Sequence, residues 1–240
     1  MTDGLRRGGL PAVAALAVAA LAAAPAAAQD GFALSRPDQH LWRWATVERE
    51  TVARAAPEDG ARVVARVRTR TPERTPEALP VLERRATAGR LWVRVRLPIL
   101  PNGSQGCVRR DRLGPYQAVR THLVVDRRRL TARLERRGRT VFRARVGIGR
   151  AKWPTPAGEF LVRNRLTGFR NPLYGALAFG TSARSPVLTD WPGGGFIGIH
   201  GTNQPQLIPG RPSHGCIRMR NADILRLARR MPVGTPVSIR

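Results

Sequence analysis

Short runs of alternating apolar and polar residues, separated by turn residues, constrain the fold of this 240-residue chain more than any other feature. Residues 91–97, LWVRVRL, show this alternation most clearly. Alternation with a period of two predicts strands that bury one face. The other predicted strands are 61–67, 79–82, 122–125, 130–134, 140–146 and 236–239.

One segment near the C-terminus has apolar residues at helical spacing. Ile224, Leu227 and Met231 form its apolar side, Asn221 is placed to cap the helix, and Pro232 is placed to stop it. The sequence therefore predicts a mainly β protein with one short C-terminal helix.

The first 28 residues have the layout of a secretory signal peptide. Arg6 and Arg7 supply positive charge, 10–24 form an alanine-rich apolar run, and 26–28 are small residues suited to cleavage before Gln29. The apolar run has about fifteen residues, which is short against the ~20 that a membrane span needs. An uncleaved anchor is the alternative. We expect an exported protein on the periplasmic or extracellular face, without stable membrane insertion after cleavage.

Turn residues divide the rest of the chain into two predicted domains. Turns at 57–60 and 101–104 separate closely spaced strands within residues 29–116, a pattern typical of a small barrel. Residues 109–120 combine charged residues with Gly114, Pro115 and little periodicity, so the predicted linker lies near 114–119 and the second domain covers 119–240.

The stretch 198–219, GIHGTNQPQLIPGRPSHGCIRM, contains the side chains best suited to chemistry. Its prolines and Gly210 exclude one continuous helix or strand between His200 and Cys216, so the segment loops back and can bring the imidazole to the thiol. A histidine or another positive charge beside a thiol lowers the thiol pKa to about 3.5–7.5 and favours the nucleophilic thiolate. We therefore expect a lowered pKa for Cys216.

Two neighbours of Cys216 are suited to the same chemistry. Gly215 has no side chain, so backbone N–H groups can approach a developing oxyanion. If 216–219 is extended, Arg218 shares the face of the cysteine and its guanidinium can bind a substrate carboxylate.

The stretch resembles the signature of the L,D-transpeptidases of the bacterial cell wall, which have a YkuD-type catalytic domain. Residues 153–160, WPTPAGEF, resemble the TPxGxF turn of that family. Residues 91–113 resemble the end of a bacterial SH3-like domain, except that Cys107 stands where a tryptophan is expected. The resemblance implies a small SH3-like barrel followed by a YkuD-type β-sandwich catalytic domain. The residues that match the signature are His200-Gly201-Thr202-Asn203 and Ser213-His214-Gly215-Cys216-Ile217-Arg218-Met219.

By this resemblance Cys216 is the nucleophile and His200 the proton donor and acceptor. The implied reaction cross-links peptidoglycan stem peptides through a cysteine acyl-enzyme and releases D-alanine from a tetrapeptide donor. The resemblance implies a location in the cell wall, and it implies no metal or organic cofactor. It also implies substrate-binding or supporting roles for Ser213, His214, Gly215, Arg218, Gly201 and Thr202.

Three alternatives remain open from the sequence. An L,D-carboxypeptidase would use water in place of the acceptor amine. A non-catalytic wall-binding protein would have its cysteine capped, for example by a disulfide between Cys216 and Cys107. A zinc site would use the two histidines and the cysteine of the stretch, which contains no fourth ligand.

The net charge of +26 comes almost entirely from arginine, since Lys152 is the only lysine. Such a charge favours anionic partners. The arginines are spread along the chain rather than gathered in one stripe, which is not typical of nucleic-acid binding. We expect acidic wall polymers as partners and no nucleic acid.

Overall fold

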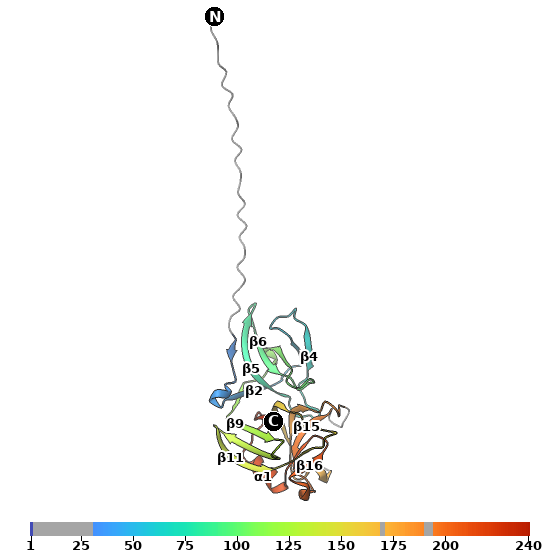
Figure 1. The fold of residues 1–240 in the computed structure, drawn as a ribbon. Helices are drawn as coiled ribbons and strands as arrows, with labels where there is room; N and C mark the ends of the chain where they lie inside the picture. The colour runs from blue at the N-terminus through green and yellow to red at the C-terminus, as the bar shows by residue number, and fades with distance from the viewer. Residues whose placement is uncertain (2–30, 169–170, 190–193) are drawn as a thin grey trace.

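The computed structural model describes Met1 and residues 31–168, 171–189 and 194–240. Residues 2–28 of the predicted signal peptide lie outside this description. Figure 1 shows two halves that pack end to end, the upper one containing β2, β4, β5 and β6 and the lower one β9, β11, β15, β16 and α1. One sheet has eight strands and the other has ten. In the described ranges, no helix is long and apolar enough to cross a membrane.

The first sheet has the strand order β4-β3-β7-β6-β5-β2-β8, and β1 pairs with β5. Val93, Val95 and Leu97 are buried whereas Arg94 and Arg96 are not, which confirms the predicted alternation for 93–97. At the start of the predicted strand it fails, because Leu91 is exposed and Trp92 is buried. Short 3-10 helices cover Pro37–Gln39 (η1) and Arg110–Arg112 (η2). The strands are β1 (Phe32–Ala33), β2 (Trp42–Thr46), β3 (Thr51–Arg54), β4 (Val63–Val67), β5 (Ala78–Thr87), β6 (Arg90–Arg96), β7 (Gln105–Arg109) and β8 (Gln117–Val119).

The second sheet has the order β11-β10-β9-β18-β13-β14-β15-β17-β12-β16. Strand β13 (Gly158–Leu166) joins its two parts, because its first residues pair with β18 and its last residues with β14. Side chains from both parts share one core, so the sheet closes around them. The other strands are β9 (Thr121–Asp126), β10 (Thr131–Arg136), β11 (Arg139–Arg145), β12 (Gly147–Gly149), β14 (Ala178–Arg184), β15 (Phe196–His200), β16 (Gly210–Ser213), β17 (Ile217–Arg218) and β18 (Pro236–Ile239).

The described residues contain one α-helix, α1 (Asn221–Ala228), and two further 3-10 helices, η3 (Pro172–Tyr174) and η4 (Pro205–Leu207). Ile224 and Leu227 of α1 are fully buried in the core of the second sheet. A mainly β protein with one short C-terminal helix is therefore confirmed, while the SH3-like assignment of the first sheet stays a prediction.

The predicted linker near 114–119 is partly a strand. Strand β8 pairs with β2 and so belongs to the first sheet. It ends at Val119, and β9 of the second sheet begins at Thr121. The chain therefore passes from one sheet to the other within one residue, which leaves little freedom at this junction.

Buried polar contacts hold the two sheets together. Arg163 of β13 donates from Nε to Glu77 Oε1 at 2.8 Å, and its Nη2 donates to Oε2 of the same carboxylate. The next residue, Asn164, donates to Thr75 Oγ1 at 3.0 Å. A buried ion pair is costly to break because the remaining charge would be left without a partner. These contacts therefore fix the orientation of the first sheet against β13.

Candidate active site

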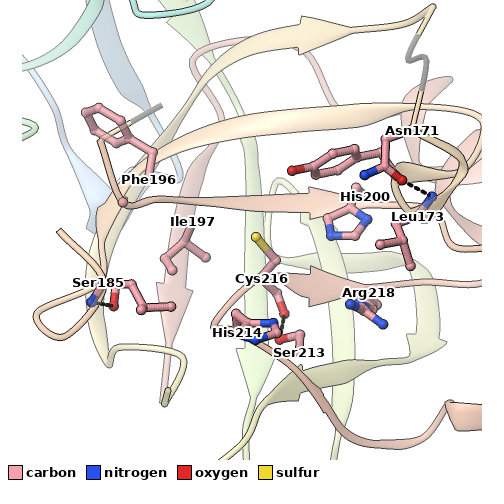
Figure 2. Close-up of a pocket in the computed structure, with 13 residues that line it drawn as sticks. Asn171, Leu173, Ser185, Phe196, Ile197, His200, Ser213, His214, Cys216 and Arg218 are labelled. Carbon is pink, nitrogen blue, oxygen red and sulfur yellow. Dashed lines mark hydrogen bonds between the residues drawn. The ribbon is translucent and has the colours of Figure 1, made fainter. Parts of the chain in front are cut away.

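Parallel pairing of β15 with β17 brings His200 and Cys216 to the same place. Ile199 lies opposite Ile217 and both are fully buried, which anchors the two strands. Cys216 directly precedes β17, and its Sγ accepts the N–H of Gly198 at 3.4 Å. Figure 2 shows the Cys216 sulfur directed toward the neighbouring strand that carries His200.

Both side chains line a cavity of about 160 Å³. Of the eight predicted site residues, His200, Ser213, His214, Cys216 and Arg218 line it. Gly201, Thr202 and Gly215 do not line it and lie in the adjoining turns. The remaining lining residues are Asn171, Leu173, Tyr174, Ser185, Leu188, Gly195, Phe196 and Ile197.

His200 is held as a neutral base. Its Nδ1 lies 2.6 Å from the carbonyl oxygen of Gly201. A carbonyl only accepts, so Nδ1 carries the hydrogen and Nε2 keeps its lone pair. Burial lowers the pKa of His200 to about 4, and Arg218 also lowers it, although the hydrogen bond to Gly201 opposes the shift. The ring of Tyr174, which sequence reasoning missed, packs edge-on against the imidazole at 5.1 Å between centroids.

The thiol of Cys216 is free, and its pKa is raised rather than lowered. Burial is the largest cause of the rise, and it outweighs the Gly198 N–H and Arg218, which both lower this pKa. The predicted fall in the thiol pKa is therefore wrong in direction, because the sequence does not reveal how closely the protein surrounds the sulfur. At neutral pH the site holds a neutral thiol beside a neutral imidazole.

Cys107 is also a free thiol, in β7 of the first sheet. It is 3% exposed, which confirms the prediction of a small buried residue at this position. The proposed disulfide between Cys107 and Cys216 is therefore wrong in this structure. Within the described ranges, no three His, Cys, Asp or Glu side chains are grouped as metal ligands are.

The turn before Cys216 is fixed by hydroxyl groups. Ser213 Oγ donates to the Cys216 carbonyl at 2.6 Å and accepts the Gly215 N–H at 3.1 Å. Gly215 has φ of +118°, a conformation that favours glycine, and a Cβ there would lie 2.9 Å from Ile197 Cδ1. Because Ser213 already engages the Gly215 N–H, the Cys216 N–H is the backbone donor left for the predicted oxyanion site.

Thr155 holds the same turn from the opposite side. Its Oγ1 donates to the Gly215 carbonyl at 2.7 Å and accepts the Gly149 N–H at 2.9 Å. Thr155 lies in the 153–160 turn, whose sequence pattern does not reveal the role of this hydroxyl. The hydroxyl links that turn and β12 to the cysteine loop.

Thr155→Val is expected to lower the free energy of unfolding by about 1–3 kcal/mol, because two buried polar groups lose their partner while the side-chain volume stays similar. Urea denaturation followed by tryptophan fluorescence would measure the change. Thr131→Val is the matched control, since Thr131 is only partly buried in β10, and its effect should stay within about 0.5 kcal/mol. Equal effects of the two substitutions would contradict the role assigned to Thr155.

Asn221 does not cap α1 as predicted. The N-cap residue is Arg220, with no capping side-chain hydrogen bond. Instead, Asn221 Oδ1 accepts the N–H groups of Thr202 at 3.0 Å and Ala176 at 3.3 Å. The side chain thereby ties the loop after His200 to the loop that carries Tyr174.

Two further side chains shape the cavity wall. Arg218 donates from Nη1 to Gln204 Oε1 at 3.2 Å, and its buried Nε has no hydrogen-bond acceptor in the described part of the chain. His214 packs against Trp153 with ring centroids 4.1 Å apart. Burial, Arg150 and Arg218 lower the pKa of His214. The wall beside the thiol is therefore cationic at Arg218 and aromatic at His214.

The model of the L,D-transpeptidase catalytic domain family, YkuD, matches residues 120–239 of this chain. The chain is 39% identical over 109 residues to YkuD of Bacillus licheniformis, covering 45% of this chain and 59% of that protein. It is 32% identical over 162 residues to YkuD of Bacillus subtilis (strain 168), covering 68% of this chain and 82% of that protein. Both names assign these relatives to the L,D-transpeptidases provisionally.

Among solved structures, the crystal structure of a variant of the Enterococcus faecium L,D-transpeptidase is 24% identical, with a TM-score of 0.40, over 50% of this chain and 49% of that chain. The family match covers the cysteine, the histidine and the strands that position them. The chain belongs to the YkuD family of L,D-transpeptidase catalytic domains.

Proposed function

We propose that this protein is an exported L,D-transpeptidase that cross-links peptidoglycan stem peptides. The donor is a tetrapeptide stem that loses its terminal D-alanine, and the acceptor is the amine of a second stem. The observation that carries the proposal is the free Cys216 thiol on the same cavity as a buried, neutral His200 whose Nε2 can accept a proton. Membership of the YkuD family supplies the substrate class.

In this proposal the first half-reaction begins from a neutral pair. His200 Nε2 takes the thiol proton while the sulfur attacks the carbonyl carbon that precedes the terminal D-alanine. The imidazolium then gives this proton to the leaving nitrogen, the C–N bond breaks, and a thioester remains on Cys216. Because His200 is buried, its charged form is short-lived, which favours return of the proton to the leaving group.

The second half-reaction reverses these proton movements. The acceptor amine attacks the thioester, gives a proton to His200, and forms the new amide as the C–S bond breaks. The departing thiolate regains its proton from the imidazolium. Water in place of the amine would give an L,D-carboxypeptidase, which remains the alternative within the same chemistry.

Positive and polar groups around the sulfur support both steps. The Gly198 N–H and the Arg218 guanidinium stabilise negative charge on the sulfur as the proton leaves. The Cys216 N–H is the donor we assign to the oxyanion, and loss of one such donor typically costs about 2.7–4 kcal/mol in transition-state stabilisation. We assign the guanidinium of Arg218, whose Nε lacks an acceptor in the described residues, to a substrate carboxylate.

Intact-mass analysis of the full chain after incubation with a carbapenem tests the proposal. The expected result is a single adduct that peptide mapping places on Cys216. A disaccharide-tetrapeptide should give free D-alanine and a cross-linked dimer. A trimmed monomer without dimer would replace the transpeptidase by the carboxypeptidase, and the absence of both adduct and D-alanine would reject the enzyme.

Gly198→Val is expected to lower kcat by about 10²-fold or more while the protein stays folded. A Cβ at Gly198 would lie 3.9 Å from both Cys216 Sγ and His200 Cδ2, so the methyl groups of valine would enter the space between thiol and ring. Small misplacements of reacting groups have effects of this size.

Gly198→Ala is the matched control for this prediction, because its Cβ makes only ordinary van der Waals contacts with those atoms. It should retain most of the D-alanine release. Steady-state kinetics with circular dichroism as the folding check would measure both variants. An active, folded Gly198→Val protein would contradict the close approach of the two side chains.

A further inference from the structure

A second cavity, of about 370 Å³, lies between the two sheets next to the candidate active site. Phe196 lines both cavities. Figure 2 shows its ring directed away from Cys216, so the residue separates the two spaces. The guanidinium groups of Arg163 and Arg184 lie 4.2 Å and 5.0 Å from the centre of this ring. The ring of Phe196 is therefore held by arginines of β13 and β14, both in the second sheet.

Arginines dominate the charge of this second cavity. Its lining includes Arg66 of β4, Arg68 and Arg70 of the segment that follows β4, and Arg163 and Arg184 of the second sheet. Glu77 is the only carboxylate among the described lining residues, and it is already paired with Arg163. The other four arginines have no carboxylate within ion-pair distance in the described ranges, where Arg70 and Arg184 donate to backbone carbonyls.

The residues at the end of β4 match the repeat of an extended ligand. Arg66 lies in β4, and Arg68 directly follows the last residue of that strand. Arg66 and Arg68 are two positions apart and exposed, while Val67 between them is buried in the core of the first sheet. Alternate side chains of an extended strand are about 6.6 Å apart on one face, and an extended peptide presents its own side chains with the same repeat. Strand β4 is also the outermost strand of its sheet, with one edge unpaired.

Apolar residues make up the rest of the cavity lining, and they favour an acidic peptide over a phosphate polymer as the anionic ligand. Val67, Leu97, Pro98, Ile99 and Phe196 line the cavity together with the arginines. The aliphatic parts of an acidic peptide can pack on such residues, whereas the polar backbone of a phosphate polymer gains nothing from them. The mixed lining therefore favours a peptide with carboxylates.

We propose that this arginine cavity binds the carboxylates of an extended acidic peptide, part of which reaches past Phe196 to Cys216. The inference rests on the proposed function, in which this peptide is a stem peptide. The first sheet then contributes directly to substrate recognition, through Arg66 and Arg68, rather than serving only as a support for the second sheet.

Binding to the full chain carrying Cys216→Ala, which prevents turnover, tests the proposal by calorimetry. The probes are a stem tetrapeptide with free carboxylates and its fully amidated analogue. Adding Arg66→Gln and Arg68→Gln is expected to raise the Kd of the free-carboxylate peptide about 3- to 10-fold, since each partly exposed ion pair contributes modestly. The Kd of the amidated peptide should stay unchanged.

The double substitution Arg49→Gln, Arg62→Gln is the matched control. It removes the same amount of charge from exposed positions of the first half, and neither residue lines the cavity. An equal rise in Kd for the control protein would show that peptide binding depends only on the net charge of the protein, and it would overturn the proposal. If a glycerol phosphate polymer binds more tightly than the peptide, and this binding depends on Arg66 and Arg68, the choice of a peptide as the ligand is overturned.

Carbapenem adduct formation separates this proposal from the proposed function. With Cys216 present, the Arg66→Gln, Arg68→Gln protein should form the adduct at the parental rate, because the thiol cavity is untouched. If the Arg66→Gln, Arg68→Gln protein forms the adduct and also binds the peptide as tightly as the parent, the proposal for the arginine cavity is rejected and the proposed function stands. If the parent protein forms no adduct and releases no D-alanine, the proposed function fails, and the stem-peptide inference fails with it.

Discussion

Cys216→Ala is expected to reduce D-alanine release from a disaccharide-tetrapeptide to the detection limit, a loss of up to about 10⁶-fold, as is typical when the nucleophile of a covalent mechanism is removed. No other thiol is near the cavity, since Cys107 lies in β7 of the first sheet. The fold should tolerate the change, because alanine removes only the sulfur atom and the turn is held through the Cys216 carbonyl. D-Alanine release and intact mass after carbapenem treatment measure the loss.

Cys107→Ala is the matched control for the nucleophile. The same atom is removed from a buried site outside the cavity, so kcat should be unchanged while stability falls by roughly 1 kcal/mol. The carbapenem adduct should form on this variant as on the parent. Substantial D-alanine release by the Cys216→Ala protein, or loss of the adduct in the Cys107→Ala protein, would remove the basis of the mechanism.

Local sequence pattern predicted the elements whose signals are local. Strands β6, β10 and β11 follow the period-two alternation, and α1 follows the helical spacing that ends before Pro232. Strands such as β14, AFGTSAR, lack that alternation because small and polar side chains are buried on both faces. Their positions depend on pairing with partners distant in the sequence, which a pattern in one segment does not contain.

The candidate site shows the same limit. The loop between His200 and Cys216 could be predicted, and the structure places both residues on one cavity. The direction of the shift in the thiol pKa could not be predicted, because it depends on burial by neighbouring strands. Asn221 fits a helix cap in the sequence, but its side chain bonds to two loops that only the tertiary fold brings near. The arginine cavity likewise exists only where the two sheets meet.

His200→Gln is expected to lower kcat by about 10²- to 10⁴-fold, since the amide cannot carry the proton that the mechanism moves. Glutamine can still donate to the Gly201 carbonyl, so the loop should keep its position. His122→Gln is the control, because His122 lies away from the thiol cavity and bonds to Ser238 of β18. Steady-state kinetics should leave kcat of the control unchanged.

The pH dependence of the reaction follows from the two pKa shifts. Neutral His200 is the base, and its pKa is about 4, so kcat/KM should stay flat from neutral pH to about pH 5 and fall below about pH 4. The raised thiol pKa keeps the neutral pair intact at neutral pH. An acid limb near pH 6.5 would instead indicate a thiolate–imidazolium pair in the resting enzyme and contradict the neutral-pair mechanism.

The same shift predicts a change in stability that needs no substrate. In the unfolded chain His200 binds a proton near pH 6.5, whereas in the folded protein it does so only near pH 4, so the stabilisation is present above pH 6.5 and is lost as the pH falls to about 4. The loss amounts to about 3 kcal/mol at 1.36 kcal/mol per pKa unit. Urea denaturation at pH 7 and pH 4 should show this difference between the parent and His200→Gln, because glutamine does not titrate. If the free energy of unfolding changes equally with pH in the two proteins, the pKa of His200 is not lowered by folding. The imidazole would then be too accessible to water for the role assigned to it.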